Sequence, residues 1–493
     1  MPVTSLVEWR DWSAAAFAEA RDDRAPVLLA LGTRWCPATA AMMRAAYSDP
    51  AVTRLVRRRF VPIRVDADAR PDIADRYGLG GWPTTSFLTP EGDVLGGETY
   101  VTAERMRHLL QRVADAFATQ REALAERRPP AGRRAVVASA DAPDPGVNAW
   151  LAKHLLDEFD PEHGGFGAGA KRVHADALEL ASRLARDGDE RFDPVVDRTL
   201  GAMAWGGLYD HLDGGVFRYC ARRDWTEPAT EKLLDVNAAA LRLFLEREEE
   251  DFREQAADLI GYVSQTLTDR TPDRAGFFAS QRADADYHRL RATGDQPDGA
   301  PPPVDRTIYA DRSAVMARAY ARAGEVLDDA ALIEHAVAAI EHVVASTYER
   351  GGGIAHRAGA PGGVRGLLAD QVGVSAALLD LYAATERDVY LDIAQELMHF
   401  ALGRLWDAEG GGGFLDRVPA ADDIGLLRER VRPFAANCEA ARVLLRLARI
   451  TADASFRARA VATLAAQTPV ARAHGVDAAP YALAMRDLRG PEA

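Results

Sequence analysis

The sequence predicts an α/β domain followed by a larger all-α domain built as a closed ring of helical hairpins, an (α/α)6 toroid. Short apolar runs alternate with helical patterns over residues 1–125, as in an α/β domain. Residues 126–146 are rich in Pro, Ala, Arg and Asp without hydrophobic period, which is typical of a linker. Over 147–493 only helical patterns remain, broken by glycine-rich loops at intervals of roughly 50 to 80 residues, about the length of two helices with connections.

Length and composition limit the functions that this chain can have. With 493 residues it is too long for one core, and a net charge of −14 argues against an extended nucleic-acid interface. No run approaches the ~18 apolar residues of a membrane span. Three widely spaced cysteines do not make a disulfide framework or a zinc cluster. The opening Met1–Ser5 does not resemble a signal peptide, so we expect a cytoplasmic protein.

The elements of the first domain follow from its apolar runs. We expect helices at 7–22, 37–46, 52–59, 73–77 and 102–119, strands at 27–31 and 60–66, and a β-hairpin formed by 86–88 and 94–96. With the consecutive helices 37–46 and 52–59 taken together, the order after the opening helix is β-α-β-α-β-β-α, which is the order of the thioredoxin fold.

Cys36 is the candidate catalytic residue of this domain, because it lies between a buried strand and the start of a helix. Unpaired backbone N–H groups and the positive end of the helix dipole favour a thiolate there. Thr39 occupies the place of the second cysteine of a Cys-x-x-Cys motif, and its hydroxyl can hydrogen-bond the thiolate. Pro83 stands where the fold has a cis-proline beside the active cysteine. Either Cys36 is a single-thiol nucleophile that needs an external thiol, or it is vestigial.

Glycine-rich loops predict the architecture of the second domain. Six such loops suggest six helical hairpins in a closed ring, with the loops gathered at one end around a central cleft. The polar excursion at 284–304 is either a lid over that cleft or disordered. The loops lie at 163–167, 214–217, 275–278, 351–354, 412–414 and 474–476.

Ionisable residues near these loops form the candidate substrate-binding site. They either bind a sugar or another polyol through charge-assisted hydrogen bonds, or form a salt-bridge network that holds the loops. A histidine with a flanking carboxylate could also act as a general base. The residues are Tyr209, Asp210, His211, Arg218, Tyr219, Glu231 and Lys232.

The scarcity of lysine is a further hint. Only Lys153, Lys171 and Lys232 occur, and the last two fall within loop motifs, which indicates sites that need a compact ammonium rather than a guanidinium. His174 and His356 follow glycine-rich loops but have no carboxylate at metal-ligand spacing in the sequence. We therefore predict no metal and no cofactor.

Several motifs, in order along the chain, resemble the YyaL-type thioredoxin-domain proteins, whose human relative is described as spermatogenesis-associated. The resemblance covers nearly the whole chain and implies a thioredoxin-like domain before an (α/α)6 toroid similar to N-acylglucosamine 2-epimerases and six-hairpin glycosidases. It also places Asn237, Asp370 and Asn437 at positions that can face the cleft, where each could instead cap a helix or satisfy a buried loop. Matching segments include Gly81-Trp82-Pro83-Thr84, Arg64-Val65-Asp66, Gly164-Gly165-Phe166-Gly167, 206–212 and Glu231-Lys232.

The chain departs from the family pattern where chemistry is expected. The family's Cys-His-Trp-Cys-His run is replaced by Cys36-Pro37-Ala38-Thr39-Ala40, and family histidines are replaced by Phe217 and Ala229. Three hypotheses remain. The first is monothiol redox or thiol-adduct chemistry at Cys36, with the toroid binding a small sugar or thiol ligand or a protein client. The second is sugar epimerisation, isomerisation or hydrolysis in the toroid. The third is a non-catalytic binding or scaffold protein.

Overall fold

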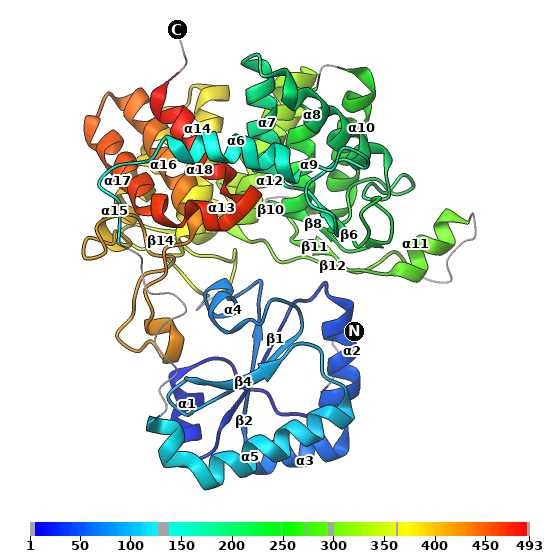
Figure 1. Cartoon of the computed structure of the whole chain (residues 1–493), viewed down its shortest axis with the longest axis vertical. Coiled ribbons are helices and arrows are strands. Elements are labelled where there is room, and N and C mark those ends of the chain that lie inside the picture. Colours follow the sequence, from blue (N-terminus) through cyan, green and yellow to red (C-terminus); the bar gives the residue numbers. More distant parts are fainter. Residues whose placement is uncertain are drawn as a thin grey trace. The chain divides into compact units, whose positions relative to one another are not determined.

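The computed structural model describes residues 5–126, 138–247, 249–271, 274–293, 300–360 and 363–490. The chain divides into two compact units: Met1–Ala135 with Pro419–Val431, and Val136–Val418 with Arg432–Ala493. Figure 1 shows the elements of each unit. Most of the linker predicted at 126–146 (residues 127–137) lies outside the described residues.

A four-stranded sheet in the order β2-β1-β3-β4 forms the centre of the first unit. Strand β1 is parallel to β2 and antiparallel to β3, and its apolar residues are buried on both faces. The sheet and its helices confirm the predicted thioredoxin-like fold (Figure 1). The strands are β1 (Val27–Gly32), β2 (Val61–Asp66), β3 (Thr84–Leu88) and β4 (Val94–Glu98), and the helices are α1 (Ala14–Asp22), α2 (Pro37–Ala45), α3 (Pro50–Arg59), α4 (Pro71–Tyr77) and α5 (Ala103–Glu126).

The opening helix starts later than the sequence predicted. It was expected at 7–22, but α1 begins at Ala14 because the Ser13 hydroxyl caps it by accepting a hydrogen bond from the Ala16 N–H. The preceding residues are extended instead: the Arg10 N–H donates to the Pro62 carbonyl at 3.0 Å, beside β2. Because pairing with β2 satisfies the backbone hydrogen-bonding groups of Arg10, the chain before Ser13 is extended rather than helical.

A distant segment, 419–431, completes the first unit, although the sequence analysis had placed it in the second domain. The Tyr77 hydroxyl donates to the Gly92 carbonyl at 2.8 Å and accepts from the Leu426 N–H at 2.9 Å. Leu427 is buried in the same apolar cluster as Ile73 and Tyr77. We call 419–431 the strap.

Replacing Tyr77 with phenylalanine is expected to lower the free energy of unfolding by about 1–2 kcal/mol, because two buried backbone groups lose their partner. Tyr100→Phe is the matched control, since Tyr100 is 48% exposed, and we expect it to have almost no effect. Urea unfolding of the full chain measures both. Equal effects for the two variants would show that the Tyr77 hydroxyl does not fix the strap.

The second unit is a ring of paired helices. Each inner helix contacts the next, in the order α7, α9, α12, α14, α16 and α18, and α18 returns to α7, so the ring is closed. This confirms the predicted (α/α)6 toroid. The inner helices are α7 (Ala175–Arg186), α9 (Leu234–Phe244), α12 (Ala310–Leu327), α14 (Leu368–Thr385), α16 (Phe434–Thr451) and α18 (Ala479–Arg489); the outer helices are α6 (Gly146–Glu158), α8 (Asp193–Trp205), α10 (Glu250–Thr266), α13 (Ala330–Thr347), α15 (Asp388–Arg404) and α17 (Ala454–Ala471).

The glycine-rich loops all lie at one end of the ring, because each connects the end of an outer helix to the start of an inner one. In three of them the residue after the glycines pairs with the chain at the end of the outer helix: Phe166 with Phe159, Val216 with Tyr209, and Phe414 with Trp406. Two more loops close through short hairpins, β9–β10 (Thr268–Thr271, Arg274–Phe277) and β13–β14 (Tyr348–Glu349, Gly353–Ile354). We call this end the loop end.

Charged side chains from all six inner helices meet inside the ring. Arg442 contacts Asp487 at 2.8 Å and Glu179 at 3.2 Å, and Arg318 contacts Asp380 and Glu439, each at 2.7 Å. Arg242 completes the set by contacting Glu179 at 3.0 Å. Burial of such charges is costly unless each has a partner, so the pairing of these residues holds neighbouring helices in register. We call this set the axial ion network.

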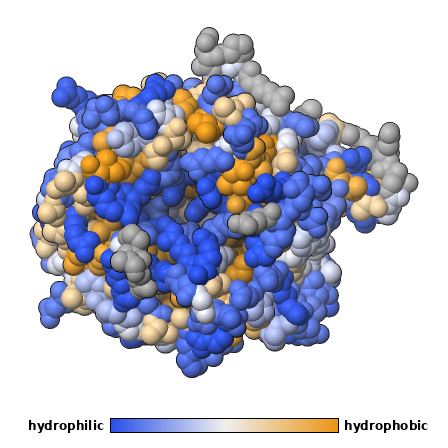
Figure 2. All heavy atoms as spheres, turned by 90° about the horizontal axis from the view of Figure 1, so that it is seen from above, coloured by the Kyte–Doolittle hydropathy of each residue, from blue (hydrophilic) through white to orange (hydrophobic). Residues whose placement is uncertain are grey.

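The face of the molecule seen in Figure 2 is mainly polar. On the face shown in Figure 2, hydrophilic residues predominate and the hydrophobic ones form small separate patches. Among the residues that the structure describes, none of the helices combines the length and the apolar character that crossing a bilayer requires.

Candidate functional site

Cys36 lies immediately before α2, at its N-cap position, and no side chain caps the helix there. Its Sγ donates to the Trp82 carbonyl at 3.6 Å, and the Trp82–Pro83 peptide bond is cis. The helix start and the cis-proline, 46 residues apart in sequence, therefore meet at the thiol, as predicted. The first unit holds no second cysteine, so an internal disulfide cannot form there.

Thr39 does not contact the thiol as the sequence analysis expected. Its Oγ1 is buried and makes no hydrogen bond among the described residues. The side chain instead packs against Gly32: a Cβ at that glycine would lie 2.5 Å from Thr39 Cγ2. Thr39 therefore fills space beside β1, and the expected hydrogen bond to the sulfur is not formed.

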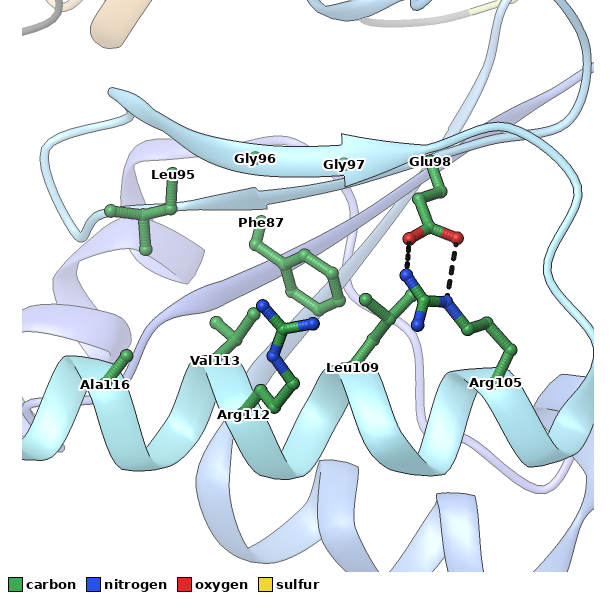
Figure 3. Close-up of a pocket in the computed structure, with 10 residues that line it drawn as sticks. All are labelled: Phe87, Leu95, Gly96, Gly97, Glu98, Arg105, Leu109, Arg112, Val113 and Ala116. Carbon is green, nitrogen blue, oxygen red and sulfur yellow. Dashed lines mark hydrogen bonds and ion pairs between the residues drawn. The ribbon is translucent and has the colours of Figure 1, made fainter.

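A separate pocket of about 360 Å³ lies between β4 and α5 in the same unit. Figure 3 shows the apolar side chains of Phe87, Leu95 and Leu109 lining it, with the Glu98–Arg105 ion pair at one end. Cys36 is not among the residues that line this pocket, so it is not a substrate pocket for the thiol.

Two buried lysines each hold one glycine-rich loop. The Lys232 ammonium donates to Asp210 at 2.7 Å and to the Gly214 carbonyl at 2.6 Å, and Lys171 contacts Asp160 at 2.9 Å and the Gly167 carbonyl at 2.7 Å. Both carboxylates also accept backbone N–H groups of their loops. Both lysines were predicted as substrate-binding residues, and in the structure their ammonium groups contact the protein's own carboxylates and carbonyls.

The negative charge of Asp210 is balanced by its neighbouring side chains. Burial by itself would raise the pKa of Asp210, but the hydrogen bond from His288 and the charge of Lys232 outweigh it and hold that pKa well below its usual range. Lys232 is fully buried, and burial lowers its pKa against the opposing effect of Asp210. The pair is therefore an ion pair that stabilises the loop.

Asn237 and Asn437 also serve the loops. Asn237 accepts from the Val216 N–H at 2.9 Å and donates to the Val216 carbonyl at 3.1 Å. Asn437 does the same for Phe414, at 2.7 and 2.9 Å. Both are completely buried. Of the two alternatives, the structure therefore places them as clamps on buried loop backbone rather than as cleft-facing ligands.

The other candidates of the loop end do not converge on one point. Tyr209 donates to Asp258 at 2.7 Å, and Arg218 forms an ion pair with Glu231 while its guanidinium lies over the ring of Tyr219. His211 is exposed. These contacts fit the salt-bridge alternative better than a preformed polyol site, although His211, Arg218 and Tyr219 keep part of their surface accessible.

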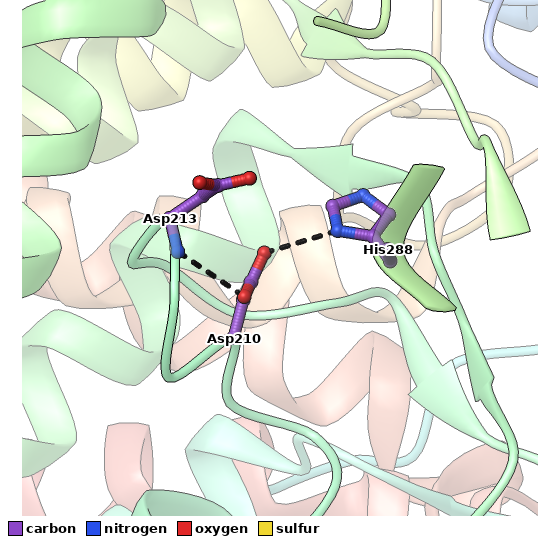
Figure 4. A group of neighbouring side chains, drawn as sticks. All are labelled: Asp210, Asp213 and His288. Carbon is purple, nitrogen blue, oxygen red and sulfur yellow. Dashed lines mark hydrogen bonds and ion pairs between the residues drawn. The ribbon is translucent and has the colours of Figure 1, made fainter. Parts of the chain in front are cut away.

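The predicted excursion at 284–304 contains a helix, α11 (Ala285–Ala292). His288 contacts Asp210 at 3.2 Å (Figure 4), and Arg291 contacts Asp213 at 2.9 Å. These contacts attach α11 to the Asp210 loop. Residues 294–299 of the excursion lie outside the described residues.

A second histidine–carboxylate group lies at the loop end. His356 Nδ1 is 2.9 Å from Asp370 Oδ1 and 3.9 Å from Asp311 Oδ1. Asp311 and Asp370 lie in the first turns of the adjacent inner helices α12 and α14. Burial raises the pKa of Asp370, and the neighbouring His356 opposes that rise. The sequence near His356 shows no carboxylate partner, because these residues are 14 and 45 positions away.

The first turn of α7 holds a carboxyl group with an unusual pKa. Burial, reinforced by Glu179 and Glu439, raises the pKa of Asp176 to about 6. Since the unfolded pKa is about 3.9, the folded state holds this proton more tightly, and stability falls as pH rises from about 4 to about 6.

Asp176→Asn is therefore expected to stabilise the protein at pH 7.5 and to lose that advantage below pH 4. Urea unfolding at the two pH values measures the difference. Asp157→Asn, at an exposed ion pair with Lys153, is the control and should show no such trend. A benefit that is the same at both pH values would contradict the assignment.

Comparisons with known proteins agree with this architecture. Residues 2–132 match the family model Thioredox_DsbH, described as a protein of unknown function, DUF255. Spermatogenesis-associated protein 20 of Homo sapiens is 28% identical over 315 residues, and that of Mus musculus is 27% identical over 319. These alignments cover 57% of this chain and 40% and 39% of the relatives. The chain thus spans about two fifths of the length of the curated relatives it matches.

Solved structures resemble the second unit in fold. A sugar epimerase from a ruminal bacterium matches with a TM-score of 0.52 at 11% identity, covering 66% of this chain and 85% of that one. Cellobiose 2-epimerase from Bacillus thermoamylovorans matches with a TM-score of 0.50 at 12% identity, covering 65% and 86%. The resemblance seen in the sequence motifs is thereby confirmed: a thioredoxin-like domain of the Thioredox_DsbH kind precedes a toroid with the fold of these sugar epimerases.

Proposed function

We propose that Cys36 acts as a single attacking thiol in thiol–disulfide exchange. The observation that carries this proposal is the position of its sulfur at the start of α2, 3.6 Å from the Trp82 carbonyl. The thiolate is the reactive form of a cysteine, and no side chain caps the helix start beside this sulfur.

The absence of a second thiol in the first unit determines the course of the reaction. The Cys36 thiolate attacks one sulfur of a disulfide, forms a mixed disulfide with it, and releases the other sulfur as a thiolate. An external thiol then attacks the mixed disulfide, takes the bound group into a new disulfide and regenerates the Cys36 thiolate. The small-molecule disulfide is the oxidant and the external thiol is the reductant, so no cofactor is needed.

Mass spectrometry of the full chain after treatment with oxidised glutathione tests this proposal. We expect one glutathionyl group per chain, on Cys36, which reduced glutathione removes. Burial raises the pKa of Cys220 to about 12 and that of Cys438 well above its usual value, so these thiols should stay unmodified.

Cys36→Ser should abolish the adduct, whereas Cys220→Ser should leave it unchanged. An adduct that persists without Cys36, or no adduct on the native chain, would overturn the proposal and favour a scaffold role for the first unit.

A second candidate function is carbohydrate binding at the loop end of the toroid. The accessible surfaces of His211, Arg218 and Tyr219 at this end support it, because planar polar and aromatic side chains bind polyols through hydrogen bonds and apolar contact. Fold similarity to proteins named as sugar epimerases adds weight. Sugar epimerisation or isomerisation would need, in addition, a proton-transfer group at the bound sugar.

A thermal-shift panel of mono- and disaccharides tests this second function. A sugar that raises the melting temperature of the parent chain, and less so that of Arg218→Gln, would support it. Thr53→Gln, in the other unit, is the control. No shift with any sugar would count against it without affecting the proposal for Cys36.

A further inference from the structure

We propose that Asp311, His356 and Asp370 form a binding site for one divalent transition-metal ion. The three side chains come from separate segments: the first turn of α12, the chain between β14 and α14, and the first turn of α14. One ligand atom from each lies within 4.8 Å of the others. The site is independent of the chemistry at Cys36.

The spacing of these atoms fits a shared ion. Metal–ligand bonds of about 2.0–2.2 Å place neighbouring ligand atoms about 3 to 4 Å apart. His356 Nδ1 lies 2.9 Å from one carboxylate oxygen and 3.9 Å from the other. The ion can therefore enter between the three groups with small side-chain movements.

An unpaired oxygen points to a missing partner. Asp370 is completely buried, and its Oδ2 makes no hydrogen bond among the described residues. A buried carboxylate oxygen without a partner is costly. A cation would supply the interaction that the protein does not.

The charge of the group distinguishes it from the other histidine–carboxylate cluster. Asp210 and Asp213 approach His288 (Figure 4), but Lys232 and Arg291 already pair with these carboxylates. In the described part of the chain no lysine or arginine pairs with Asp311 or Asp370. A histidine binds a metal ion in its neutral form, so the two carboxylates then carry a charge that a divalent ion balances.

The ligand types select the ion. One imidazole nitrogen with two carboxylates suits Zn²⁺ or Mn²⁺, whereas Mg²⁺ and Ca²⁺ prefer oxygen ligands alone. The side chain of Asp311 is 31% exposed, so this side of the site is open to solvent and to a further ligand.

Titration calorimetry of the full chain, after dialysis against a chelator, tests the site with Mn²⁺ and Zn²⁺ in turn. We expect one ion per chain, and binding at least about 10-fold weaker in Asp370→Asn and His356→Gln. Asp311→Asn should weaken binding similarly, and its partly exposed position makes it the variant least expected to disturb folding. Mg²⁺ should bind more weakly than either ion.

Two histidine variants serve as controls. His174 pairs with Asp477 at 3.0 Å without a third ligand, and His288 belongs to the neutralised cluster, so His174→Gln and His288→Gln should bind the ion as the parent does. The proposal is overturned if the parent binds neither ion, or if Asp311→Asn retains full affinity.

Discussion

Lys232→Met is expected to lower the free energy of unfolding by about 3–5 kcal/mol, because it leaves the buried Asp210 carboxylate without its ammonium partner. Lys232 is fully enclosed and joins Asp210 to the Gly214 carbonyl. Lys153→Met is the matched control, since this lysine is exposed and, among the described residues, pairs with Asp157 one turn along its helix. We expect that control to cost about 0.5 kcal/mol or less.

Lys232→Arg extends the test. A planar guanidinium is larger than the ammonium and cannot place its donors in the same enclosed space, so this variant should also be destabilised although the charge is kept. Urea unfolding followed by circular dichroism measures all three variants. Equal stability of Lys232→Met and Lys153→Met would show that the ammonium does not hold the loop.

The regular spacing of the glycine-rich loops, and with it the ring, could be predicted because each loop depends on the backbone conformation of its own glycines. Gly164 and Gly165 have φ values of 76° and 73°, a region that favours glycine, and glycines with positive φ also precede the inner helices α9, α14, α16 and α18. The position of Cys36 at a helix start could be predicted for a similar reason, since the strand, the cysteine and the proline that begins the helix are adjacent in the sequence.

Contacts between distant residues could not be predicted in this way. The Asp311–His356–Asp370 group forms only when two inner helices lie side by side, and nothing near His356 in the sequence marks its partners. The position of the strap could not be predicted either, because nothing in the sequence around Leu427 indicates that it packs in the same cluster as Ile73. For Asn237 and Asn437 the sequence leaves two alternatives open, because it does not tell whether an amide faces a ligand or a loop.

The second large effect is a gain of function. Thr39→Cys should close an internal disulfide with Cys36, because the two positions are the N-cap and third residue of α2 and lie one turn apart on the same face. Cysteine is no larger than the threonine that packs against Gly32. The oxidised variant should have two free thiols fewer than its reduced form. When supplied with a dithiol it should reduce insulin disulfides faster than the parent, because the parent needs an external thiol to resolve each mixed disulfide.

Ala38→Cys is the control, because a side chain two positions from Cys36 lies on another face of the helix and should not form the bond. Thiol counting under denaturing conditions and peptide mapping measure the outcome. A Thr39→Cys chain that keeps all its thiols after oxidation would contradict a thioredoxin-type geometry at this helix start.

The axial ion network also affects how the chain folds during its synthesis. Glu179 contacts Arg442, which lies 263 residues later, and Arg442 contacts Asp487 on the last helix of the ring. During synthesis, the early helices of the ring therefore keep unpaired charges and exposed apolar faces until the late helices have left the ribosome. Contacts of such long sequence separation slow folding, and exposed intermediates aggregate. A chain cut before α18 should therefore accumulate as insoluble or chaperone-bound protein instead of a smaller soluble ring.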